Sequence, residues 1–134
     1  MSAKRFTLVF IVIFFATTIG NFLIHGMLLR PDYDKSLSLL RTEQGDAHLP
    51  FLLLAFFFFS LAFVWMYAQG VGDKPWLGQG IRYGIAIWLV ASVMRYLVDF
   101  AVAPWPGMTI AKEIGYELPL LLILGVLVAA LSRE

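Results

Sequence analysis

Four stretches of apolar residues, separated by short polar segments, make up most of the chain. They cover about residues 6–29, 51–69, 81–103 and 112–131. A helix rises about 1.5 Å per residue, so about 20 apolar residues cross the hydrocarbon core of a bilayer. The pattern therefore predicts an all-α integral membrane protein, with residues 1–134 forming one four-helix bundle.

The first apolar stretch follows Lys4 and Arg5, a pattern that a cleaved signal peptide shares. The stretch is longer than the core of a signal peptide, and residues 16–18 (Ala-Thr-Thr) form a poor cleavage site. We therefore interpret it as the first membrane helix.

Two prolines mark predicted irregularities. Pro31 ends the first helix and begins a polar loop over residues 30–49, in which residues 36–41 are predicted to form a short interfacial helix and residues 42–48 a loop. Pro119 lies inside the fourth stretch. We expect it to kink that helix near residues 115–117 and to turn either Glu117 or the freed backbone carbonyl toward the interior of the bundle.

Composition supports the membrane assignment and narrows the chemistry. The chain is 60% hydrophobic and 14% charged, far from the balance of soluble domains. Its net charge of +1 gives no reason to expect nucleic acid as a partner. Cysteine is absent, which excludes disulfides and thiol catalysis. His25 is the only histidine within the predicted spans, which argues against a bis-histidine haem, and we predict no cofactor and no metal.

Basic residues in the loops bear on orientation. Lys4, Arg5, Lys74, Arg82 and Arg133 fall on one side of the predicted membrane, and Arg30, Lys35, Arg41 and Lys112 fall on the other. This slight excess, with two basic residues at the very start, predicts cytoplasmic termini and an outer loop at residues 30–49. The expected partners are the lipid bilayer and either further copies of the chain or the subunits of a larger membrane complex.

Polar side chains within the spans gather at one depth, on the side of the long loop. Arg95 and Asp99 are one helical turn apart, and an ionised group in hydrocarbon costs about 2.5–3.5 kcal/mol on insertion scales, so both charges need partners. We expect Asp99 or Glu117 to neutralise Arg95. The complete predicted cluster is Asn21, His25, Arg95, Tyr96, Asp99, Tyr116 and Glu117.

This cluster has two interpretations. It can hold the bundle together through interhelical hydrogen bonds, or it can be a site for a proton, an ion, a lipid headgroup or a small solute. Separately, basic and aromatic residues near the predicted span ends are candidate headgroup contacts: Lys74, Trp76, Arg82 and Trp105.

Two short segments, residues 21–26 (Asn-Phe-Leu-Ile-His-Gly) and residues 75–84 (Pro-Trp-Leu-Gly-Gln-Gly-Ile-Arg-Tyr-Gly), give the chain a family resemblance. With them the chain resembles small four-span bacterial inner-membrane proteins of unknown function. The resemblance covers most of the chain and implies an inner-membrane setting, but it implies no substrate and no catalytic residue.

The sequence shows no nucleophile with an adjacent base and no catalytic pair of carboxylates. We therefore predict a non-enzymatic accessory or structural membrane subunit, with a lipid headgroup or a small ligand as the candidate occupant of its polar cluster. The alternative is a small homo-oligomeric transporter or channel whose path is lined by Arg95, Asp99, Glu117 and His25. An enzyme acting on a lipid is a third interpretation.

Overall fold

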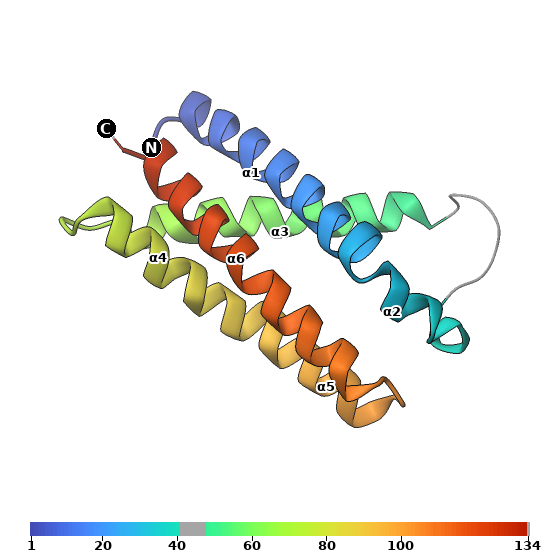
Figure 1. Cartoon of the computed structure of the whole chain (residues 1–134). Helices are drawn as coiled ribbons and strands as arrows, with labels where there is room; N and C mark the ends of the chain where they lie inside the picture. Colours follow the sequence, from blue (N-terminus) through green and yellow to red (C-terminus); the bar gives the residue numbers. More distant parts are fainter. Residues whose placement is uncertain (41–47, 134) are drawn as a thin grey trace.

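The computed structural model describes residues 1–40 and 48–133, and long helices dominate this part of the chain (Figure 1). The all-α prediction is confirmed, and no strand occurs among the described residues. In chain order the elements are α1 (Ala3–Leu23), the π-helical turn η1 (Ile24–Leu28), α2 (Arg30–Asp34), the 3₁₀ turn η2 (Leu37–Leu39), α3 (Leu49–Gly70), α4 (Trp76–Ile87), the π-helical turn η3 (Trp88–Val93), α5 (Met94–Val102) and α6 (Gly107–Leu131).

Four helices are long and apolar enough to cross a membrane, which fits a multi-pass membrane protein. They cover Ala3–Leu28, Leu49–Gly70, Trp76–Val102 and Gly107–Leu131. The third and fourth begin before residues 81 and 112, where the apolar pattern placed their starts, because the polar and glycine-containing turns that precede the apolar runs are helical too. Between α2 and α3, the predicted interfacial helix appears as the single turn η2, and the predicted loop over residues 42–48 lies outside the described residues except for His48.

Helix α6 forms the centre of the bundle. In the most apolar 18-residue stretch of α6, 39% of the residues are buried, whereas 17–22% are buried in the corresponding stretches of the other three spans. Its inward side packs on the other helices through an apolar core whose members are fully buried: Val9, Ile13, Phe63, Val64, Leu124 and Val128.

Glycines join α4 to α6 at very short range. A Cβ atom added to Gly84 would lie 2.5 Å from the Leu121 carbonyl oxygen, and one added to Gly80 would lie 2.6 Å from that of Gly125. Small residues four apart on a membrane helix let two backbones come into contact. This contact fixes the axis of α4, and therefore the position of η3 and α5 beside the first half of α6.

Both termini lie at the same end of the bundle (Figure 1). Arg5 joins them there, because its Nε donates a hydrogen bond to the Leu131 carbonyl oxygen at 3.0 Å. At the other end, the first half of α3 stands away from the core. The buried residues of α3 all lie in its second half, from Ser60 onward, whereas the first half from Leu49 to Phe59 is exposed or half-buried throughout.

The proline in the fourth span leaves the helix continuous. Helix α6 runs unbroken from Gly107 to Leu131 with Pro119 inside it, so the expected kink does not interrupt the helix. Glu117 nevertheless points inward and is buried. Trp88 of η3 donates from its indole Nε1 to the Ile114 carbonyl oxygen at 2.9 Å, in the stretch of α6 just before the proline.

Candidate functional site

Two buried carboxylates, Glu113 and Glu117, lie one turn apart on the inward side of α6. Glu117 Oε1 accepts a hydrogen bond from the Ser92 hydroxyl at 3.1 Å, and its Oε2 lies 3.4 Å from His25 Nε2. Glu113 Oε2 accepts from the Tyr33 hydroxyl at 3.0 Å. Buried charges in proteins need such partners, because they have lost the solvation that water gives them.

His25 connects the two carboxylates. Its Nδ1 lies 2.6 Å from the Tyr33 hydroxyl oxygen, and its Nε2 lies 3.4 Å from the Tyr96 hydroxyl oxygen. Because the single Tyr33 proton is directed to Glu113, His25 Nδ1 acts as the donor to Tyr33. Nε2 then accepts from Tyr96 when the ring is neutral, or donates to Glu117 when the ring is charged. We call the six residues together the buried network: His25, Tyr33, Ser92, Tyr96, Glu113 and Glu117.

Tyr33 lies in α2, which follows α1 and η1 in the chain, and its hydroxyl reaches Glu113 of α6. An ion pair between Lys112 and Asp32, with nitrogen–oxygen distances of 3.0 and 3.2 Å, ties α2 to the first turns of α6. The Tyr33 ring also packs edge-on against Trp105, with centroids 6.2 Å apart. Burial, and then the negative charge of Glu113, raises the pKa of the Tyr33 hydroxyl.

The π-helical turn η3 keeps one face of the third span directed at α6. Four residues make slightly more than one turn of an ideal α-helix. Side chains spaced four apart, such as Gly84, Trp88, Ser92 and Tyr96, would therefore point in gradually changing directions along the helix. A π-helical turn holds more residues per turn and offsets that drift. Ser92 and Tyr96 are accordingly both buried against α6, far along the helix from the glycine contact.

A cavity of about 520 Å³ opens beside the buried network, between α1 and the first half of α3. Its polar lining groups come from α1, η1, α2, α5 and α6, and every lining residue from α3 is apolar. We call the α3 part the apolar wall and the polar groups the polar wall. We call the cavity itself the α1–α3 cavity. Its lining includes Asn21, Phe22, His25, Tyr33, Leu49, Leu52, Leu53, Phe56, Arg95, Tyr96, Asp99, Trp105 and Glu113.

Arg95 and Asp99 lie on the wall of this cavity and not in the buried network. No ion pair of Arg95 with Asp99 or Glu117 is found among the described residues, so the expected pairing does not form. The guanidinium instead lies 5.0 Å from the centre of the Tyr96 ring, and Arg95 is exposed. The carboxylate of Glu117 contacts His25 and Ser92 instead of Arg95.

The remaining predicted site residues are distributed as follows. Asn21 lines the cavity and donates from its side chain to the Thr17 carbonyl oxygen at 2.9 Å. Tyr116 lies apart from the cluster, because one residue before the buried Glu117 is the outward face of α6, where the ring is 38% exposed. Of the headgroup candidates, Trp105 lines the cavity, and Lys74 and Arg82 are exposed near the opposite end.

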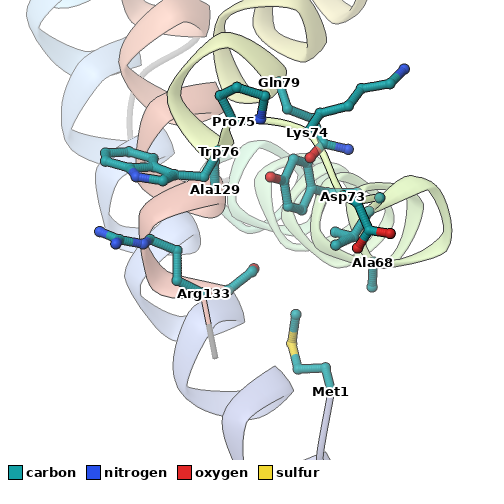
Figure 2. Close-up of a pocket in the computed structure, with 13 residues that line it drawn as sticks. Met1, Ala68, Asp73, Lys74, Pro75, Trp76, Gln79, Ala129 and Arg133 are labelled. Carbon is teal, nitrogen blue, oxygen red and sulfur yellow. The ribbon is translucent and has the colours of Figure 1, made fainter.

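A second cavity, of about 650 Å³, lies at the end where the termini meet (Figure 2). Figure 2 shows Trp76 and Arg133 beside each other on its wall, and the guanidinium carbon of Arg133 is 4.8 Å from the Trp76 ring centre. Asp73 and Lys74, of opposite charge, also line this cavity. No described residue of the buried network reaches it.

Three members of the buried network were not in the predicted cluster: Tyr33, Ser92 and Glu113. Tyr33 lies outside every apolar stretch, in the short helix α2 beyond the first span, and its place in the site depends on a contact with the distant Glu113. For Glu113 and Ser92 a signal was present, because each lies four residues before another member of the network, Glu117 and Tyr96.

Among residues 1–40 and 48–133, no group of three or more histidine, aspartate and glutamate side chains is arranged to hold a metal ion. The arrangement instead offers hydrogen-bonding and charged groups at one wall of an apolar cavity, a combination suited to a ligand that is polar at one part and apolar at another. No family model, no curated protein and no solved structure matches the chain.

Proposed function

We propose that this protein is a non-enzymatic membrane subunit that binds an amphiphile in the α1–α3 cavity. The observation that carries the proposal is the division of the cavity into two walls. His25, Arg95 and Asp99 offer charge and hydrogen bonds on one side, and Leu52, Leu53 and Phe56 offer hydrocarbon contact on the other. Sites for small molecules commonly combine a mostly apolar lining with a few polar groups that fix orientation.

The exposed first half of α3 supports entry from the bilayer. Phe22 of α1 and Leu52 of α3 both line the cavity and are both more than a third exposed, at 65% and 50%. In a bilayer these side chains would meet lipid tails. An amphiphile would then reach the polar wall sideways between α1 and α3.

A transporter path through a single chain receives less support. Between the buried network and the end that carries the termini, the described buried core consists mainly of apolar side chains such as Ile13, Val64 and Leu124. Its hydroxyl groups there belong to Thr17, Ser60 and Tyr67. An ion would lose its hydration there without a continuous set of replacement ligands. We further propose a bacterial inner-membrane location with cytoplasmic termini, which places the cavity toward the outer surface.

Filling the cavity tests the proposal. Leu53→Trp adds bulk to a residue that lines the cavity, and Leu54→Trp adds the same bulk to its exposed neighbour, which does not line it. Both variants are purified in mild detergent, and co-purifying amphiphiles are counted by native mass spectrometry. We expect Leu53→Trp to lose a bound species that the wild type and Leu54→Trp retain. Equal retention by all three proteins would contradict the proposal.

A further inference from the structure

Two opposite charges in the α1–α3 cavity lack an ionic partner within the described chain. Arg95 and Asp99 both line the cavity, one turn apart, and no ion pair joins them. Charged residues within apolar membrane spans cost free energy unless an opposite charge or a hydrogen-bonding group lies beside them. The carboxylates of Glu113 and Glu117, in contrast, already accept hydrogen bonds inside the bundle, from Tyr33 and Ser92 respectively.

Arg95 lies over the Tyr96 ring and forms no ion pair with Asp99. Its guanidinium carbon lies 5.0 Å from the centre of the Tyr96 ring, and Tyr96 is itself almost fully buried, with its hydroxyl 3.4 Å from His25. Stacking on an aromatic face leaves the edge donors of a guanidinium directed outward. The Arg95 side chain is thus held by a fixed ring, and its donors remain available to an anion in the cavity.

From this geometry we infer that the amphiphile carries a zwitterionic headgroup, with an ammonium group next to Asp99 and a phosphodiester next to Arg95. The inference rests on the proposed function and names the class of ligand. Guanidinium is the side-chain group best suited to phosphate oxygens, which it binds with two parallel hydrogen bonds. A carboxylate accepts hydrogen bonds from an ammonium group in the same charge-assisted way.

The apolar wall accounts for the rest of such a molecule. Leu49, Leu52, Leu53 and Phe56 recur every three or four residues, so they form one stripe along α3. Acyl chains leaving the headgroup can follow this stripe into the bilayer. A purely water-soluble phosphoethanolamine would leave this stripe without contacts.

The test compares headgroups at constant chain length. Delipidated protein in mild detergent is titrated with dioctanoyl phosphatidylethanolamine, with dioctanoyl phosphatidylglycerol and with free phosphoethanolamine, and bound species are counted by native mass spectrometry. We expect the ethanolamine lipid to bind about tenfold more tightly than the glycerol lipid, because one charge-assisted hydrogen bond separates them. Free phosphoethanolamine should not bind at concentrations that saturate the lipid.

Two substitutions test which part of the headgroup each charged side chain contacts. Asp99→Asn should weaken the ethanolamine lipid about tenfold and leave the glycerol lipid unchanged, whereas Arg95→Gln should weaken both. Asp34→Asn and Lys35→Gln are matched controls, because these residues are exposed near the same end of the bundle and do not line the cavity. Both controls should bind like the wild type.

The outcomes separate the two proposals. Equal binding of the two lipids, or an equal effect of Asp99→Asn on both, would overturn the zwitterion while leaving an amphiphile site in place. Failure of both lipids to bind, or binding of free phosphoethanolamine as tight as that of the lipid, would overturn the proposed function itself.

Discussion

The His25 imidazole faces a partner at each ring nitrogen, Tyr33 at Nδ1 and both Glu117 and Tyr96 at Nε2. His25 Nε2 and Glu117 Oε2 are 3.4 Å apart, and Glu117 is buried. With Nδ1 donating to Tyr33, Nε2 is the ring nitrogen that lies between Glu117 and Tyr96. The pair of His25 and Glu117 is the group of residues whose removal should matter most for the stability of the site.

Breaking this pair should be costly, and removing both partners should be less so. We expect His25→Leu and Glu117→Leu each to lower the free energy of unfolding by about 3 kcal/mol, because each strands a polar group away from water. The double variant should lose less than the sum of the two single losses. Thermal unfolding in detergent measures all three. Simple additivity would show that the two residues are not coupled.

Tyr33 gives a prediction with a defined dependence on pH. Its hydroxyl pKa is raised above the ordinary value of 10.0, so the folded protein holds this proton more tightly than the unfolded chain does. Its contribution is therefore complete below pH 10 and is lost as the pH rises above it. Tyr33→Phe also leaves Glu113 without its donor.

We expect Tyr33→Phe to be less stable than the wild type by about 1–3 kcal/mol at neutral pH. The difference should shrink as the pH rises above 10.0, where only the wild type loses this contribution. Unfolding curves for the two proteins across that range test it. A difference that stays constant with pH would contradict the role given to this hydroxyl.

Among the helices, the contact of α4 with α6 depends on glycine. A methyl group at Gly84 would collide with the Leu121 backbone, which cannot move aside as a flexible side chain can. At Gly115, also on a membrane-spanning helix, nothing lies within 4 Å of an added Cβ. The same substitution should therefore have opposite effects at the two positions.

Gly84→Ala should destabilise the protein by about 1–3 kcal/mol, the usual cost of overpacking a close contact. Gly115→Ala should be neutral or stabilising by up to about 1 kcal/mol, because alanine favours the helix. Thermal unfolding of both variants in the same detergent measures the contrast. Equal effects would mean that the backbones do not touch at Gly84.

The helical elements follow from the sequence far more readily than the site does. Long apolar stretches predict helices because the backbone N–H and C=O groups of a membrane span must form their hydrogen bonds within the protein. All four stretches appear as helices. The π-helical turns at Ile24–Leu28 and Trp88–Val93 have no such signature, yet they decide which side chains face inward. The expected pairing of Arg95 with Asp99 or Glu117 is absent among the described residues, while the burial of Glu117 was foreseen.

The position of Tyr33 could not be read from the sequence for a different reason. It depends on contacts between segments far apart in the chain, chiefly the ion pair of Asp32 with Lys112 and the ring contact with Trp105. Periodicity within a helix reports which residues share a face of that helix. It carries no information about which distant helix a short polar segment beyond the span will contact.

In the molecule as a whole, both termini lie at the same end of the bundle (Figure 1). The topology is then decided by the side of the membrane on which that end lies. The excess of loop lysine and arginine favours the cytoplasm. The chain contains no cysteine, so single cysteines can be introduced without background. Ser38 and Gly72 suit this purpose, because both are exposed and they lie in connections at opposite ends of the bundle.

We expect an impermeant thiol reagent to label Ser38→Cys on intact bacterial cells and to label Gly72→Cys only after the inner membrane is opened. The reason is that residues 30–49 are assigned to the outside and the α3–α4 connection to the cytoplasm. The reverse pattern would invert the proposed topology and place the α1–α3 cavity toward the cytoplasm.

The claim that joins fold to function is that the α1–α3 cavity is occupied by an amphiphile and that its apolar wall is the face of α3 that carries Leu52, Leu53 and Phe56. The most direct measurement is photolabelling of the purified protein with a phosphatidylethanolamine that bears a diazirine in its acyl chain, followed by mass-spectrometric mapping of the adducts. We expect adducts that are concentrated on those three residues and on Phe22 and that unlabelled lipid competes away. Adducts spread evenly over the exposed apolar residues that do not line the cavity, such as Leu54 and Phe58, and insensitive to competitor, would contradict it.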